Sequence, residues 1–232
     1  MNTLKTDGLK KRWIELSEYL HTLSFAEVIP NSRIKSKKIN LSKKALIAKG
    51  INTKKKTDLK KYIFKNSAMC HGGYLETRGL YSDYSAFQDN KRDIHLGMDI
   101  WTTHETEVIS PIDAEVFSAF DNIGIGNYGP TIILKHSALE TDFFTLYGHL
   151  TQDSIRSLSR GQLIKKGQSF GKVGHESENG GWPPHVHFQL ILDLLHHKVD
   201  FPGVCNKENL TFYQSICPDP NIILKLESTQ RL

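Results

Sequence analysis

The stretch EVISPIDAEVFSAF, residues 107–120, is the first of five short apolar runs that decide the fold. The other four are GPTIILKH (129–136), DFFTLYGHL (142–150), GQLIKKGQSFGKVG (161–174) and HVHFQLIL (185–192). Glycine and proline turns separate the runs, and no long helical pattern lies between them. Strands at this spacing are typical of an all-β sheet or sandwich. We therefore expect this part of the chain to be mainly β.

The N-terminal part of the chain has a helical pattern. Leucines and a tryptophan recur at helical spacing from Leu9 to Leu23, and Asp7 is a suitable capping residue for this helix. Two shorter helices are predicted, one over KKALIAK between Ser42 and Gly50 and one over residues 57–65. We expect residues 1–70 to form a small basic helical region and residues 71–232 to form a separate domain.

Positive charge is concentrated in that helical region. The segment Arg33–Lys65 contains thirteen Lys or Arg and one acid, whereas the remaining chain has 17 basic and 24 acidic residues. Residues 41–64, LSKKALIAKGINTKKKTDLKKYIF, loosely resemble the SAP module, which implies nucleic-acid binding through lysines. Such contacts would be salt-sensitive and independent of sequence. The alternative is a solvated basic face on a small helical packing unit.

The number and spacing of the cysteines, together with the hydropathy, indicate the cellular compartment. The chain has no run of about 20 apolar residues and no recognisable signal peptide. Its three cysteines, Cys70, Cys205 and Cys217, are too far apart for a close disulfide framework or for the usual zinc spacing. We expect free thiols, no membrane segment and a cytoplasmic location.

Histidines in the β-rich part are placed as metal ligands would be. His95 and Asp99 would lie about 13 Å apart in a continuous strand, but Gly97 between them permits a bend. His185 and His187 share one face of a strand, because residues two apart point the same way. His149 follows an apolar strand and, by the same alternation, shares a face with Tyr147. A catalytic zinc site takes three nitrogen or oxygen ligands and leaves one position open, so this set suits Zn²⁺.

Together these motifs resemble peptidase family M23, the LytM or lysostaphin-like zinc metallopeptidases. The resemblance rests on HLGMD (95–99), SPIDAEV (110–116), YGHL (147–150), the glycine-punctuated turns after residue 161 and HVHF (185–188). It implies an antiparallel β-sheet or sandwich of the duplicated hybrid motif type. By the same resemblance, His95, Asp99 and His187 would be zinc ligands and His149 and His185 the catalytic pair. Which of these two histidines is the general base stays open.

The resemblance also implies a substrate class. Secreted members cleave peptide cross-links of bacterial cell walls, but this chain resembles more closely the M23-like domains fused to class III aminotransferases. The segment GGYLETRGLYSDYSAF and the loop ENGGWPP carry that likeness. They suggest a non-wall amide or peptide substrate, with Arg78, Tyr147 and Trp182 as substrate contacts and Tyr81 and Tyr84 as further groove residues.

Gln189 stands where many family members have glutamate. The polar surroundings of the metal ligands are therefore expected to differ from those of other members.

The sequence thus predicts a zinc-dependent hydrolase of amide or peptide bonds. A non-enzymatic regulator or binding module with the same fold is one alternative, and a nucleic-acid-associated protein is another.

Overall fold

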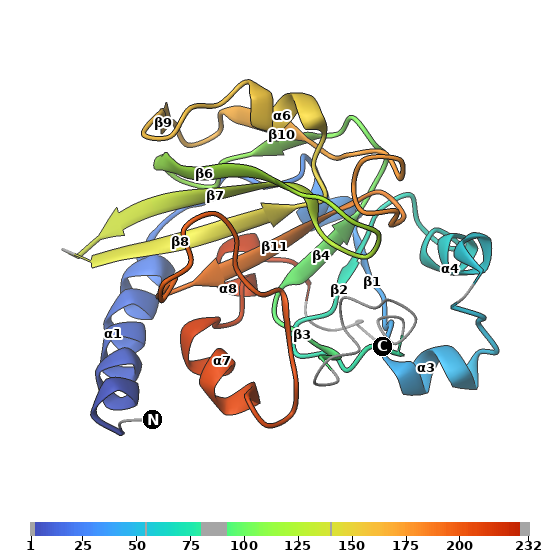
Figure 1. Cartoon of the computed structure of the whole chain (residues 1–232), viewed down its shortest axis with the longest axis horizontal. Coiled ribbons are helices and arrows are strands. Elements are labelled where there is room, and N and C mark those ends of the chain that lie inside the picture. The colour runs from blue at the N-terminus through green and yellow to red at the C-terminus, as the bar shows by residue number, and fades with distance from the viewer. Residues whose placement is uncertain (1–2, 54, 80–91, 140, 228–232) are drawn as a thin grey trace.

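An eight-stranded sheet forms the centre of the computed structural model, which describes residues 3–53, 55–79, 92–139 and 141–227 (Figure 1). Tyr81 and Tyr84 lie outside these residues. The strand order is β1-β2-β4-β11-β8-β7-β6-β9. Among the described strands of this sheet, β1 and β2 pair in parallel, and all other adjacent strands pair antiparallel. The prediction of a mainly β structure is confirmed.

The strands of the large sheet come from both halves of the chain. They are β1 (Lys37–Lys38), β2 (Cys70–Gly72), β4 (Met98–Trp101), β6 (Ala114–Asn122), β7 (Gly129–Ala138), β8 (Thr141–Gly148), β9 (Leu163–Ile164) and β11 (His185–Ile191). Two small sheets flank it, one formed by β5 (Glu107–Ile109) with β10 (Ser169–Lys172) and the other by β3 (Ile94–His95) with β12 (Val204–Cys205).

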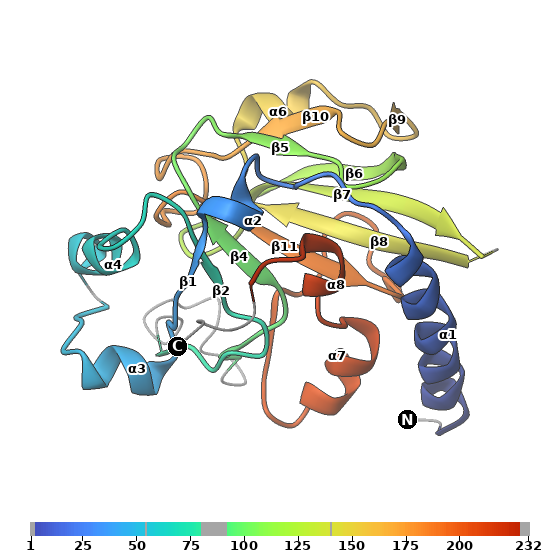
Figure 2. The ribbon, with the colours of Figure 1, turned by 180° about the vertical axis from the view of Figure 1, so that it is seen from behind.

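The helices are short apart from the first and lie around the sheet. They are α1 (Thr3–Thr22), α2 (Ser32–Lys35), α3 (Lys43–Ala48), α4 (Lys56–Ile63), α6 (Gln152–Arg156), α7 (Leu210–Ile216) and α8 (Asn221–Leu224). Figure 2 shows α1, α7 and α8 beside the sheet, with α3 and α4 at its opposite flank. No helix of the described residues is long and apolar enough to cross a membrane.

Apolar side chains fill both faces of the sheet. One face carries Val186, Phe188 and Leu190 of β11 and packs against Leu16 and Leu20 of α1. Each such buried leucine contributes roughly 1.5–3 kcal/mol relative to its exposed state. The opposite face carries the histidines of β11 and a second apolar cluster that includes residues of α7. Because both faces are covered, every residue of β11 is buried.

The predicted N-terminal helices are present with small shifts at their ends. The first begins at Thr3, before the predicted cap Asp7. Ser42 caps α3 by accepting from the Ala45 backbone N–H at 3.3 Å, and Gly50 after it has a φ of 65°. Residues of α1 share a core cluster with β4 and β11, so the N-terminal region packs directly on the sheet. The division at residue 70 stays a prediction.

Candidate metal centre and cleft

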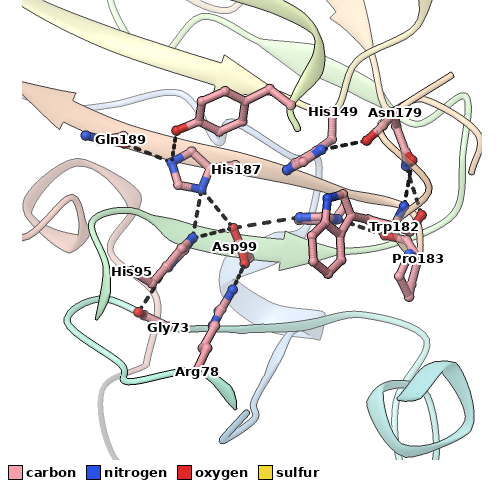
Figure 3. Close-up of polar contacts among 12 residues, drawn as sticks. Gly73, Arg78, His95, Asp99, His149, Asn179, Trp182, Pro183, His187 and Gln189 are labelled. Carbon is pink, nitrogen blue, oxygen red and sulfur yellow. Dashed lines mark hydrogen bonds and ion pairs between the residues drawn. The ribbon is translucent and has the colours of Figure 1, made fainter. Parts of the chain in front are cut away.

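Pairing of β4 with β11 places two of the predicted ligands side by side. Asp99 and His187 are direct partners in this antiparallel ladder. The strand is interrupted between β3 and β4, and the bend there brings the side chain of His95 next to those of Asp99 and His187. His95 Nε2 and His187 Nδ1 lie 2.8 Å apart, and each lies 3.2 Å from Asp99 Oδ1 (Figure 3). All three side chains are almost fully buried.

Gly97 allows this convergence by its small size. A Cβ at this position would lie 2.6 Å from both Cε1 and Nε2 of His187 and 2.7 Å from the Phe188 carbonyl oxygen. Real Cβ atoms do not approach other atoms so closely, so a side chain at residue 97 would displace the imidazole. The bend expected at Gly97 is one reason for glycine at this position, and the close approach of the His187 ring is a second.

Hydrogen bonds on the far side of each ring fix the histidine tautomers. His95 Nδ1 lies 3.0 Å from the Gly73 carbonyl oxygen, which can only accept, so this nitrogen donates. His187 Nε2 lies 2.9 Å from Gln189 Oε1. The Gln189 amide nitrogen donates to the Pro202 carbonyl oxygen and to Cys217 Sγ, so its oxygen must face His187. Both rings therefore direct an unprotonated nitrogen toward Asp99.

Three acceptor atoms consequently converge: His95 Nε2, His187 Nδ1 and Asp99 Oδ1. They lie 2.8–3.2 Å from one another. Lone pairs at this distance repel unless a cation lies among them. Two imidazoles and one carboxylate are the ligand types of catalytic zinc sites. The donor set therefore fits a divalent metal ion, and the three predicted ligands are brought together.

The charges around the cluster keep it in the metal-binding state. Burial and then the Arg78 charge lower the pKa of His95 to about 3, against the opposing effect of Asp99. Burial raises the pKa of Asp99, but His95 and Arg78 outweigh it, so this pKa lies well below its usual value. Arg78 Nη1 donates to Asp99 Oδ2 at 2.5 Å. At neutral pH His95 is therefore a neutral imidazole and Asp99 an ionised carboxylate.

His149 and His185 lie next to the ligands, with ring centroids 4.2 Å apart. His149 Nδ1 donates to the Asn179 carbonyl oxygen and His185 Nδ1 to the Pro183 carbonyl oxygen, both at 2.8 Å. Each ring thus keeps an unprotonated Nε2, and that of His185 lies 3.9 Å from Asp99 Oδ1. Burial lowers the pKa of His185, and burial together with His185 holds that of His149 well below its usual value.

The position of His149 corrects one prediction. Strand alternation would place it on the face of Tyr147, which is the core face. His149 instead has a φ of 63°, and this left-handed conformation turns its side chain toward His187. Tyr147, predicted to contact substrate, is a core residue: it is fully buried and its ring packs edge-on against Phe170 and Phe188. We therefore withdraw Tyr147 from the substrate contacts.

The other two predicted substrate contacts line the cleft beside the metal centre. Trp182 lies edge-on to His149, with centroids 6.4 Å apart. Arg78 also lines the cleft, but its guanidinium bonds to Asp99 and, at 2.9 Å, to Glu76 Oε2. The cleft has a volume of about 340 Å³.

Tyr128 is a site residue that the sequence analysis missed. Its hydroxyl lies 3.3 Å from His187 Nε2, and its ring lies 5.6 Å from that of His149. Gly148 and Gly203 make room for it, because a Cβ at either residue would lie within 2.5 Å of the tyrosine. His197 also lines the cleft. Neither residue is near a ligand motif in sequence, so ligand spacing could not have indicated them.

The remaining histidines and cysteines do not join the cluster. His136 is buried and bonded through both ring nitrogens to the Asp113 carbonyl oxygen and Thr145 Oγ1. The three cysteines are free and buried, as expected. In the part of the chain that the structure describes, the one group of three metal-ligating side chains is His95, Asp99 and His187.

The spacing and geometry of this cluster agree with a family match. Residues 93–200 match the model of peptidase family M23. This M23 region contains all five predicted metal and catalytic residues, and it supports a peptidase-like role. No curated protein matches the chain.

Several solved structures are similar to part of the chain. A zinc-containing peptidase from Vibrio cholerae is 26% identical, with a TM-score of 0.35 over 42% of this chain and 27% of its own. The lysostaphin catalytic domain from Staphylococcus simulans is 22% identical, with a TM-score of 0.36 over 53% and 80%. A mutant catalytic domain of the prophage-encoded M23 protein EnpA from Enterococcus faecalis is 22% identical, with a TM-score of 0.40 over 59% and 86%. The chain thus spans about a quarter of the length of the Vibrio cholerae peptidase.

Proposed function

We propose that the chain is a zinc-dependent hydrolase of peptide or amide bonds. The observation that carries this proposal is the convergence of three unprotonated ligand atoms, His95 Nε2, Asp99 Oδ1 and His187 Nδ1, beside two further neutral histidines. The family match over residues 93–200 supports the same chemistry. Zinc is the metal that this donor set suits best.

The site residues have two roles, metal binding and proton transfer. His95, Asp99 and His187 would hold the metal. A bound zinc ion supplies polarisation of the scissile carbonyl and activation of water. His149 and His185 are neutral at physiological pH because burial lowers their pKa values, so either can accept a proton from the attacking water. Once protonated at Nε2, that ring can deliver the proton to the leaving amine. The other ring could donate to the developing oxyanion only after it too had gained a proton at Nε2, because its Nδ1 proton is held by a backbone carbonyl.

The dimensions of the cleft favour a small substrate. A volume of about 340 Å³ accommodates a few residues of an extended peptide or a small amide. The resemblance to M23-like domains of aminotransferase fusions also favours a small amide or peptide as substrate, and a substrate located in the cytoplasm. The alternative of a nucleic-acid partner for residues 33–65 has no support in the family match or the described structure.

The test is zinc analysis of the purified full chain combined with cleavage of a mixture of internally quenched peptides. We expect about one zinc per chain, cleavage that chelation abolishes, and zinc-dependent recovery. His149→Ala and His185→Ala should keep zinc but lose cleavage by 100-fold or more, an effect typical of general acid–base residues, about 10²–10⁴-fold. His175→Ala, an exposed histidine of the neighbouring loop, is the control. A zinc-loaded protein that cuts none of these peptides would favour the non-enzymatic binding module.

A further inference from the structure

The basic N-terminal region supplies one wall of the cleft. Leu41 and two residues of α4, Leu59 and Ile63, line the cleft together with Trp101 and Trp182. These five side chains belong to one apolar cluster, and each is at least 93% buried. Figure 3 shows the ribbon of α4 beside the loop that carries Trp182. The M23 match begins at residue 93, so three of these five residues lie outside it.

This wall contacts the two histidines assigned to proton transfer. Trp101 stacks on His185, with ring centroids 5.6 Å apart and planes 22° apart. Trp182 lies edge-on to His149 at 6.4 Å. A group bound against the wall therefore lies within about one residue of the bond that these histidines would act on.

Polar contacts hold the wall in a fixed position relative to the metal centre. The Leu41 backbone N–H donates to Glu76 Oε1 at 2.8 Å, and the other carboxylate oxygen of Glu76 accepts from Arg78, which also bonds Asp99. On the outer side of α4, Lys60 pairs with Glu176 at 2.6 Å. These contacts link the wall to the Arg78–Asp99 pair and to the loop that carries Glu176.

None of the described lysines of α4 lines the cleft. Lys56, Lys60 and Lys61 are exposed, whereas Leu59 and Ile63 are buried at the cleft. The helix therefore presents lysines to solvent and an aliphatic surface to the substrate space. The basic N-terminal region therefore contributes apolar lining to the cleft.

We propose that this wall is a side-chain subsite that selects substrates with a bulky aliphatic or aromatic group next to the scissile amide. The proposal rests on the proposed function for its scissile bond. Glycine leaves the apolar wall uncovered, whereas a leucine or phenylalanine side chain removes that wall and itself from water. One methylene in an apolar pocket changes discrimination by about 10- to 200-fold, so leucine and phenylalanine peptides should be preferred over glycine peptides by at least about 10-fold.

The experiment separates binding from cleavage. Two of the three tryptophans of the chain line the cleft, so peptide binding can be followed by tryptophan fluorescence as well as by calorimetry. The probes are Gly-Leu-Gly, Gly-Phe-Gly and Gly-Gly-Gly amides, titrated into the zinc-loaded full chain. We expect the leucine and phenylalanine peptides to bind at least 10-fold more tightly than triglycine. In cleavage assays the same order should hold for kcat/KM.

Two matched leucine variants test the wall. Leu59→Ala should reduce the preference for leucine over glycine by about 10-fold, because it removes wall surface. Leu46→Ala is the control: Leu46 belongs to the same apolar cluster and is 2% exposed, but it does not line the cleft. Leu46→Ala should keep the preference. Thermal unfolding of both variants shows whether either has lost its fold, and Ile63→Val is the milder substitute for Leu59→Ala.

The outcomes distinguish the two proposals. Equal binding of the three peptides, or an equal loss of preference in Leu59→Ala and Leu46→Ala, overturns the subsite, whether or not any peptide is cut. Preferential binding without cleavage supports the subsite and counts against the hydrolase.

Discussion

Gln189 Oε1 lies 2.9 Å from His187 Nε2, and this contact determines which nitrogen of His187 faces the metal centre. The Gln189 amide nitrogen is held by the Pro202 carbonyl oxygen and by Cys217 Sγ, at 3.2 and 3.3 Å. Rotation of the amide by 180° would point its nitrogen at His187 and its oxygen at another carbonyl oxygen. The orientation of Gln189 is therefore fixed, and with it the tautomer of His187.

Gln189→Met should weaken zinc binding by about 10- to 100-fold, because methionine fills the space but accepts no hydrogen bond from His187. Competition with a chromophoric chelator measures the affinity. Gln189→Glu is the matched variant: it keeps an oxygen toward His187 but turns another toward the Pro202 carbonyl. We expect it to retain zinc affinity within a few-fold and to lose about 1–3 kcal/mol of unfolding free energy. Equal zinc affinity in Gln189→Met and the parent chain would contradict this role.

Gly97→Ala should destabilise the fold and the metal centre together. The added Cβ would lie 2.6 Å from the His187 ring, so the ring or the β3–β4 connection must move. Such overpacking costs about 1–3 kcal/mol, and the displaced ligand lowers zinc affinity. Urea unfolding and zinc titration measure the two effects. Gly8→Ala in α1 is the control, since a Cβ there meets no atom within 4 Å and should stabilise the helix by about 0.5–1 kcal/mol.

The metal ligands could be predicted because they lie in short motifs whose residue spacing brings their side chains together. His185 and His187 share a strand face by alternation, and His95 with Asp99 needs a single bend at Gly97. The ladder between β4 and β11, which places Asp99 opposite His187, is a long-range pairing that the sequence did not indicate. The mainly β fold followed from the spacing of apolar runs and turns.

Other features depended on tertiary contacts or on unusual backbone geometry. A left-handed conformation is rare for residues other than glycine, so the turn of His149 out of the Tyr147 face could not be inferred from sequence. The packing of Leu59 and Ile63 into the cleft joins residues separated by more than a hundred positions from Trp182. In sequence those residues show only an amphipathic helix with lysines on its other side.

His136 should make stability depend on pH. Burial lowers the pKa of His136 to about 4, against a raising effect of the Asp113 carbonyl, while an unfolded histidine titrates near 6.5. Between these values the unfolded chain binds more protons than the folded chain. The contribution of His136 to the free energy of unfolding is therefore complete above about pH 6.5 and is lost as the pH falls toward 4. The parent slope should exceed that of His136→Gln by up to about 1.4 kcal/mol per pH unit.

Urea unfolding of the metal-free chain at a series of pH values measures this slope. Using metal-free protein keeps zinc release out of the measurement. Parallel stability curves for the parent and His136→Gln would show that His136 titrates alike in both states.

Arg78 and zinc should oppose each other at Asp99. Arg78 Nη1 donates to Asp99 Oδ2 at 2.5 Å, and both side chains are at most 3% exposed. Arg78→Met leaves the Asp99 carboxylate buried without its cationic partner, which costs about 3–5 kcal/mol in the metal-free chain. Zinc restores a positive charge beside Asp99, so the variant should be destabilised less when zinc is bound. By linkage, Arg78→Met should therefore bind zinc more tightly than the parent chain.

Unfolding free energies with and without zinc, together with chelator competition, test this opposition. The control is Arg156→Met, which removes an exposed ion pair with Asp153 at 3.5 Å and should change stability by less than about 1 kcal/mol in both states. If Arg78 acted mainly by orienting Asp99 as a ligand, Arg78→Met would weaken zinc binding, as Gln189→Met does. The direction of the change in zinc affinity therefore separates charge competition from positioning.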